Sequence, residues 1–206
     1  MRAMNHPLMN LTKALGNKIE QELPMEHLLP DRLPIYVSSF VYMFGILTMA
    51  SFILVILSGM TMAFEGPLWY QFSAAGAVMR SIHFWGVQVF FFFLFLHFFS
   101  VFFMAGWREG RAATWIIGSF LLLFSIVEAF TGFLTQGGFF AQWNQVQSKD
   151  AFNSIGISGF FNVLNNGQLY GLHISIIPAI LVLLLIIHLT LIRQKGVVPP
   201  IEALKK

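Results

Sequence analysis

The stretch that decides the fold is RSIHFWGVQVFFFFLFLHF, at residues 80–98. It is almost wholly apolar, yet it contains two histidines, His83 and His97, at an offset of 14. A second apolar stretch, LHISIIPAILVLLLIIH, contains His173 and His188 at an offset of 15. A histidine inside a membrane is costly and is therefore usually functional. The sequence thus predicts two membrane helices that each present two histidines.

The offsets predict two histidine pairs at different depths in the membrane. With four spans, the second and fourth run in the same direction, so His83 is level with His173 and His97 with His188. At about 1.5 Å per residue the two levels are about 21 to 22.5 Å apart. Zinc usually takes four protein ligands, whereas two axial imidazoles complete six-coordinate haem iron. The pattern therefore favours two bis-histidine haems, and four hydrogen-bonded structural histidines are the alternative.

The composition is typical of a membrane protein, because 57% of residues are hydrophobic and 10% are charged, against about 25% charged in soluble domains. We expect an all-α membrane protein, a bundle of four transmembrane helices holding two haems. Residues 1–34 would form a cytoplasmic-side amphipathic segment, 35–193 the four-helix di-haem domain, and 194–206 a cytoplasmic tail. The four apolar stretches long enough to span are Ile35–Phe64, Met79–Ala105, Ala112–Thr135 and Leu169–Arg193.

Basic residues predict the orientation. Ten of the 12 lysines and arginines fall in the N-terminal segment, in the loop between the second and third spans, or in the C-terminal part of the chain counted from Arg193. The exceptions are Arg80 and Lys149. Positive charge collects on the cytoplasmic side, so we expect a multi-pass protein of the plasma membrane with both termini cytoplasmic. The net charge of +3 then reflects orientation, and no nucleic-acid partner is expected.

Two segments outside the spans leave alternatives open. Residues 8–23 place apolar side chains every three or four positions, which is typical of a helix on the membrane surface, although a loosely ordered leader is equally consistent. The connection between the third and fourth spans is long and runs from residue 136 to residue 168. Loops of that length usually carry function or contain short helices of their own.

Glycines repeat the histidine spacing in the other two spans. Gly45 and Gly59 stand at an offset of 14, as do Gly118 and Gly132. A glycine lets a flat ring or another backbone come close, so we expect these four to provide clearance for haem. Ordinary helix packing is the alternative. A kink at Pro178 would absorb the extra residue between the histidines of the fourth span.

Three charged residues are further candidates for the site. Arg80 and Arg193 lie near opposite membrane faces, where each would pair with a haem propionate or anchor its helix end by snorkelling. Glu128 is the one carboxylate inside a span. It would accept a proton near a quinone or hydrogen-bond a polar group in the bundle. Cysteine is absent, so iron–sulfur clusters and thioether-linked haem are excluded on this chain, and both haems would be non-covalent haem b.

Several motifs resemble the N-terminal haem-binding half of cytochrome b from quinol-oxidising cytochrome bc-type complexes. RSIHFW (80–85) looks like the start of that family's second helix, and WIIGSFLLLFSIVEAFTGF (115–133) looks like its third. LYGLHISIIP (169–178) and HLTLIRQKGVVPP (188–200) look like its fourth. The resemblance covers about residues 30–200 and is closest to the split, b6-type version.

The resemblance implies an electron-transport subunit of a respiratory or photosynthetic quinol oxidoreductase. His83 and His173 would hold the iron of the outer, low-potential haem, and His97 and His188 that of the cytoplasmic-side, high-potential haem. Quinol would be oxidised outside and quinone reduced near the cytoplasmic side. The implied partners are a subunit-IV-like membrane protein, a Rieske iron–sulfur protein, and a c-type cytochrome or other acceptor, in a dimeric complex. The chain alone would not be active.

The sequence departs from the b6 pattern at several positions. Leu134, Thr135 and Gln136 stand where many members have Leu-Pro-Trp, and Ser100 and Gln168 stand where b6 has arginines. Two other functions remain: a di-haem b membrane anchor of a dehydrogenase or hydrogenase, and a transporter or structural bundle without a cofactor. A reduced b-type absorption band separates the last from the others, and copurifying subunits separate the first two.

Overall fold

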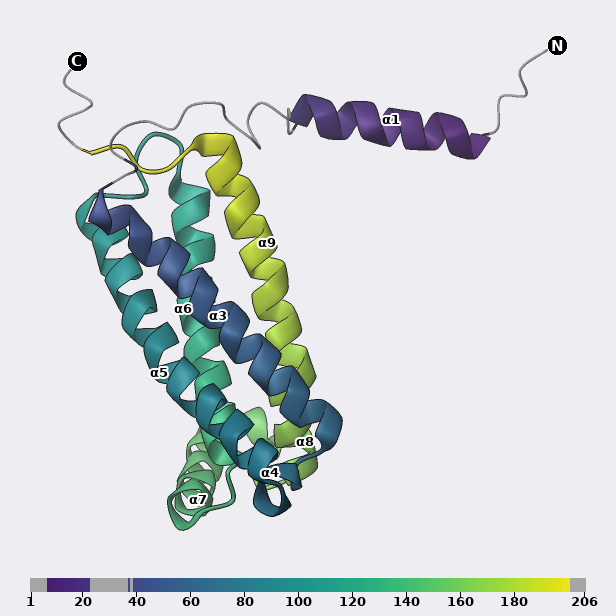
Figure 1. Cartoon of the computed structure of the whole chain (residues 1–206), viewed down its shortest axis with the longest axis vertical. Helices are drawn as coiled ribbons and strands as arrows, with labels where there is room; N and C mark the ends of the chain where they lie inside the picture. Colours follow the sequence, from purple (N-terminus) through teal and green to yellow (C-terminus); the bar gives the residue numbers. More distant parts are fainter. Residues whose placement is uncertain (1–6, 23–36, 38, 201–206) are drawn as a thin grey trace.

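Four long helices stand side by side in the computed structural model, which describes residues 7–22, 37 and 39–200 (Figure 1). All secondary structure in this described part is helical. The elements are α1 (Pro7–Glu22), α3 (Phe40–Glu65), α4 (Trp69–Phe72), α5 (Ala74–Phe103), α6 (Ala112–Leu134), α7 (Phe139–Ser154), the short 3-10 helix η2 (Ile157–Gly159), α8 (Asn166–Gly171), the π-helical stretch η3 (Leu172–Ile176) and α9 (Ile177–Lys195).

Four helices within the described residues are long and apolar enough to cross a membrane: α3, α5, α6, and the continuous run of α8, η3 and α9 at Asn166–Lys195. The predicted all-α, four-helix membrane architecture is confirmed. The second helix begins earlier than the sequence predicts: α5 starts at Ala74, whereas the predicted span starts at Met79. Ser73 precedes it, and the Ser73 hydroxyl accepts a hydrogen bond from the Gly76 amide at 3.3 Å, as an N-cap does.

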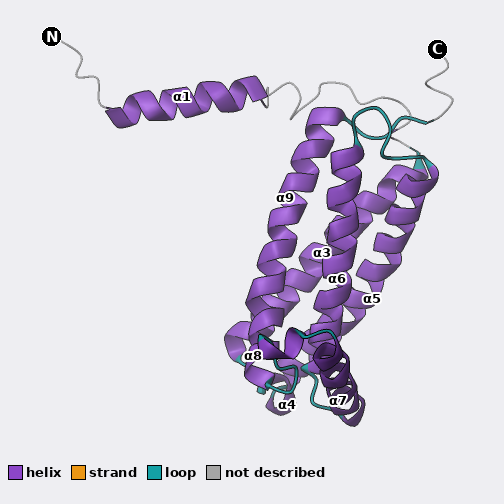
Figure 2. Cartoon of the chain, turned by 180° about the vertical axis from the view of Figure 1, so that it is seen from behind, coloured by secondary structure: helices purple, strands orange, loops and turns teal. Residues whose placement is uncertain are grey.

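The connections gather at two ends of the bundle. The α5–α6 connection and the end of α9 lie at one end, and α4, α7 and α8 lie at the other (Figures 1 and 2). At the first end, Arg111 donates hydrogen bonds to the backbone carbonyls of Lys195 and Gly196 at 3.1 and 3.4 Å. The Tyr42 hydroxyl donates to the Val198 carbonyl at 2.6 Å. These bonds join α3, α6 and the segment after α9.

The bundle consists of two helix pairs. α3 packs mainly against α5, and α6 packs mainly against α9, with little direct contact between the two pairs. Each pair is contiguous in the sequence. The four histidines divide between the pairs, since α5 carries His83 and His97 while η3 and α9 carry His173 and His188.

The long loop after α6 contains helices of its own, which confirms one of the two predicted alternatives. α7, η2 and α8 surround a small core of Leu134, Val163 and Leu169. Gln145 of α7 is buried, and its side-chain amide donates to the Leu134 carbonyl at 3.1 Å and to Asn166 Oδ1 at 3.0 Å. One satisfied amide thus joins the end of α6, the middle of α7 and the start of α8. Residues 7–22 are helical too, and the position of α1 on the membrane surface stays a prediction.

Candidate functional site

The structure brings His83 of α5 and His173 of η3 together at the α7 end of the bundle. Their ring centroids are 6.3 Å apart, and the ring planes meet at 85°. A metal–imidazole bond is about 2 Å long, and the ring centre lies about 1 Å beyond the nitrogen, so two imidazoles on opposite faces of one metal place their centroids about 6 Å apart. The observed separation therefore fits an iron atom held between the two rings.

The other ring nitrogen of His83 has polar partners on α3. Nδ1 lies 3.0 Å from the Val55 carbonyl and 3.1 Å from the Ser58 hydroxyl. A metal-binding histidine almost always donates its second ring N–H to a carbonyl, carboxylate or water. With Nδ1 donating to the Val55 carbonyl, Nε2 is left with its lone pair available for a metal.

His173 has a carboxyl group as its partner in the corresponding position. Its Nδ1 lies 2.9 Å from Glu128 Oε1 of α6 and 3.4 Å from the Thr131 hydroxyl. Thr131 also donates to Glu128 Oε2 at 3.4 Å. Glu128 is thus placed beside a histidine, as the second of its two predicted roles requires. A role of Glu128 in quinone chemistry stays a prediction.

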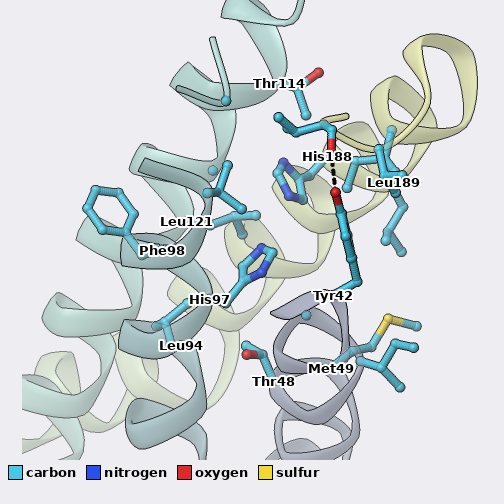
Figure 3. Close-up of a pocket in the computed structure, with 18 of the residues that line it drawn as sticks. Tyr42, Thr48, Met49, Leu94, His97, Phe98, Thr114, Leu121, His188 and Leu189 are labelled. Carbon is cyan, nitrogen blue, oxygen red and sulfur yellow. Dashed lines mark hydrogen bonds between the residues drawn. The ribbon is translucent and has the colours of Figure 1, made fainter. Parts of the chain in front are cut away.

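His97 and His188 line one cavity of about 350 Å³ between the four helices. Figure 3 shows both rings turned toward the same space, one from α5 and one from α9. The Nδ1 of His188 is buried without a hydrogen bond of good geometry, with the Thr114 backbone as its polar neighbour. The surrounding side chains are mostly apolar and include Met49, Leu94, Phe98, Leu121 and Leu189.

Each of the four predicted glycines faces one of the four histidines. A Cβ on Gly59 would lie 3.0 Å from His83 Cε1, and one on Gly132 would lie 2.5 Å from His173 Cε1. At the other level, Gly45 faces His97 and Gly118 faces His188, each at 3.1 Å from a built Cβ. The glycines therefore make room for the imidazole rings themselves, each within its own helix pair.

A π-helical turn accounts for the unequal histidine offsets. The stretch η3, which includes His173, ends two residues before Pro178. A π turn contains one residue more than the α turn it replaces, so the offset of 15 in this helix matches the offset of 14 in α5. Proline has no N–H and its ring crowds the carbonyl four residues earlier. The irregularity thus lies in the turn preceding Pro178, where the sequence predicted a kink at the proline.

The two arginines lie at opposite ends of the bundle, and a contact with haem propionates stays a prediction for both. Arg80 is exposed on α5, and its guanidinium carbon lies 4.9 Å from the centre of the Tyr70 ring of α4. This is the geometry of a cation–π contact. Arg193 is exposed in the last turn of α9.

Sequence reasoning missed the two hydroxyls and the backbone carbonyl that contact His83 and His173. Ser58 directly precedes Gly59, and Thr131 directly precedes Gly132. This repeated hydroxyl–glycine pair was a usable signal, because a hydroxyl next to the clearance glycine reaches the same imidazole. The Val55 carbonyl had no signal, since every residue has one.

The donor set fits haem better than a bare metal ion. Among the described residues, no group of three or more histidine, cysteine, aspartate or glutamate side chains could hold a metal. Two imidazoles at each level leave four coordination positions, which a porphyrin supplies. The apolar surroundings of His97 and His188 suit a largely apolar macrocycle.

Comparison with known proteins identifies a family. The family model described as Cytochrome b(N-terminal)/b6/petB matches residues 88–206. A cytochrome bc complex cytochrome b subunit from Chlorobaculum thiosulfatiphilum is 31% identical in an alignment 200 positions long, which covers 86% of this chain and 46% of that protein. A menaquinol:cytochrome c reductase cytochrome b subunit from Geobacillus thermodenitrificans is 28% identical in an alignment 216 positions long, gaps included, which covers 94% of this chain and 95% of that protein.

The fold has a counterpart among solved structures. A chain of a hyperthermophilic respiratory Complex III superimposes with a TM-score of 0.69 at 22% sequence identity, covering 92% of this chain and 55% of that one. The present chain therefore spans about half the length of the Chlorobaculum relative and of this structural neighbour. Since the family model covers more than half of the sequence and four apolar helices form the bundle, the chain belongs to the cytochrome b N-terminal/b6 family and is a multi-pass membrane protein.

Proposed function

We propose that this chain is the di-haem cytochrome b subunit of a quinol-oxidising complex and carries electrons across the membrane between two quinone sites. The observation that supports it most directly is the His83–His173 pair, whose ring centroids are 6.3 Å apart. His97 and His188 form the second pair around the cavity. Bound haems would supply two irons that each accept and release one electron at a time.

The chain's own residues would hold, orient and shield these centres. The Val55 carbonyl and Glu128 accept from the Nδ1 atoms of His83 and His173, so both outer rings keep Nε2 for iron. With His83 and His173 holding one haem and His97 and His188 the other, the haems would supply electron transfer rather than oxygen chemistry. Arg80 and Arg193 would pair with propionates at the two membrane faces.

The proposed reaction begins with quinol at the outer face. One electron would go to a Rieske iron–sulfur protein, and the other would cross the membrane by way of the two histidine pairs to quinone near the cytoplasmic side. The names of the relatives support this direction, since one is a subunit of a cytochrome bc complex and another of a menaquinol:cytochrome c reductase. They favour it over a di-haem anchor of a dehydrogenase or hydrogenase.

The proposed complex contains further subunits. We place with this chain a subunit-IV-like membrane protein, the Rieske protein, and a c-type cytochrome or other acceptor, in a dimeric assembly in the plasma membrane. The α5–α6 connection, the N-terminal segment and the C-terminal segment would be cytoplasmic, because ten of 12 basic residues lie in them. Quinol oxidation would require the partners and would be absent from the isolated chain.

The proposal predicts two b-type haems per chain, both extractable. Purified protein should give two haems per polypeptide by pyridine haemochrome assay. Acid acetone should remove both, because the chain has no cysteine for a thioether bond. Haem stain that remains on this band in a denaturing gel would contradict the prediction, and a colourless protein would remove the proposed function altogether.

Single histidine substitutions should remove the haems by level. His83→Ala and His173→Ala should lose the outer haem and keep the inner one, and His97→Ala and His188→Ala should do the reverse. Low-temperature reduced spectra of the four variants resolve the two components. If the His83 and His188 variants lost the same component, the pairing would be wrong.

A further inference from the structure

A carboxylate contacts only one of the histidines whose surroundings are described. Glu128 Oε1 lies 2.9 Å from His173 Nδ1, and both side chains are largely shielded, with 17% and 20% of their surfaces exposed. The Thr131 hydroxyl lies 3.4 Å from the second carboxylate oxygen and 2.9 Å from the Glu128 backbone carbonyl. Glu128, Thr131 and Gly132 fall at positions i, i+3 and i+4 of α6, so one helix face supplies the acceptor, the hydroxyl and the clearance for one ring.

Within the described part of the chain, no carboxylate contact of this kind is found at His83 or His188. His83 Nδ1 contacts a backbone carbonyl and a serine hydroxyl. His188 Nδ1 has no hydrogen bond of good geometry. A hydrogen bond from an imidazole N–H to an ionised acceptor is shorter and roughly twice as strong as one to a neutral acceptor. The two ligands of the outer haem are therefore electronically unequal.

We infer that Glu128 is a positioning residue for His173 that also lowers the reduction potential of the outer haem. The inference rests on the proposed function, since it concerns the haem that His83 and His173 would hold. By accepting the Nδ1 proton in a strong hydrogen bond, the carboxylate fixes the ring orientation and increases the basicity of Nε2. A more basic ligand and a nearby negative charge both stabilise ferric iron over ferrous iron.

The test is a redox titration of Glu128→Gln in the purified complex. Glutamine keeps the shape and a neutral acceptor but removes the charge. Loss of such partners typically costs about 10–100-fold in metal affinity or activity. We expect the one-electron equilibrium of the outer haem to move toward the reduced form by about tenfold, a rise of about 59 mV in midpoint potential. The inner haem, about 21 Å away by helix rise, should not move and is the internal control.

A matched variant tests the other outer ligand. Ser58→Ala removes a neutral partner of His83 and leaves the Val55 carbonyl in place. It should shift the outer potential less than Glu128→Gln does. Electron paramagnetic resonance of both variants should retain low-spin ferric signals, which would exclude ligand loss as the cause of a shift.

The outcomes separate this inference from the proposed function. A protein with no b-type haem even in its unaltered form would refute the proposed function. The inference alone would be refuted if both haems bind but the one-electron equilibrium of the outer haem shifts by less than about threefold, which is about 28 mV in midpoint potential. A fall in that midpoint potential would refute it as well. A larger upward shift, or loss of the outer haem only, would support it. Loss of both haems would mean that Glu128 stabilises the bundle rather than one ligand, and would refute it too.

Discussion

At the scale of single residues, the site has four close imidazole–glycine contacts, of which the Gly132–His173 contact leaves no room for a methyl group and the other three leave little. The built Cβ positions lie 2.5 to 3.1 Å from the facing Cε1 atoms, closer than ordinary van der Waals contact. Glycine in a helix normally costs about 0.5–1 kcal/mol relative to alanine. Here the glycines allow each imidazole ring to pack directly against the neighbouring helix, and this packing offsets the cost.

Gly132→Ala should displace His173 and weaken the outer haem. Overpacking of this kind costs about 1–3 kcal/mol, which corresponds to roughly tenfold weaker haem binding. The measurement is the outer component of the reduced-minus-oxidised spectrum relative to the inner one. Gly171→Ala is the matched control, because nothing lies within 4 Å of its built Cβ. Equal haem content in the two variants would exclude the imidazole–glycine contact as a determinant of binding.

At the scale of elements, the π turn of η3 aligns two helices whose histidine offsets differ by one residue. Without it, an offset of 15 at about 100° per residue would rotate His173 by about 60° past the face of His188, whereas an offset of 14 falls short by about 40°. π turns are often found at functional sites. Here the turn contains the ligand itself.

Deletion of Ser175 should therefore be tolerated. Removing one residue converts the π turn into an α turn and gives the fourth span the same histidine offset as α5, so both haems should remain. Deletion of Phe92 in α5 is the control, because no irregular turn lies between His83 and His97 to absorb it. That deletion rotates one ligand by about 100° and should abolish the outer haem. Loss of the outer haem in the Ser175 deletion would show that the π turn has another role.

Features that repeat with the period of a helix could be predicted from the sequence, and features that do not repeat could not. Histidine and glycine spacings follow the regular rise and rotation of a helix, so the two levels and the four-helix architecture could be predicted. The π turn interrupts that period and depends on hydrogen bonds around Pro178. The contact of Glu128 with His173 depends on how α6 and η3 are rotated against each other. The start of α5 at Ala74 was readable from the Ser73 cap and was overlooked.

At the scale of the whole molecule, the bundle has an apolar outer surface and two distinct ends. Large apolar side chains, including Phe40, Leu57, Phe92 and Phe103, are exposed along the outside of the spanning helices. Exposure of so large an apolar surface to water is unfavourable, whereas lipid or neighbouring membrane subunits can cover it. α7 and the end of α9 lie at opposite ends (Figure 1), so a label on each can report the orientation.

Single cysteines should report that orientation without background, since the chain has none of its own. Gln147→Cys lies on exposed α7, and Lys195→Cys lies at the end of α9. A membrane-impermeant maleimide should label the first in intact spheroplasts and the second only after permeabilisation. The unsubstituted chain should take up no label under either condition. The opposite labelling pattern would reverse the proposed sides of both haems and of both quinone reactions.

The division into two helix pairs has a consequence for biogenesis. Each pair is contiguous in the chain and carries its own histidines, glycines and Nδ1 acceptors, so each can be inserted by the translocon and packed before the other is complete. The porphyrins would then be the main contact between pairs that touch each other little, and their delivery would close the bundle. Cells starved of haem should accumulate an open intermediate that membrane proteases can degrade, which would couple the abundance of this subunit to cofactor supply.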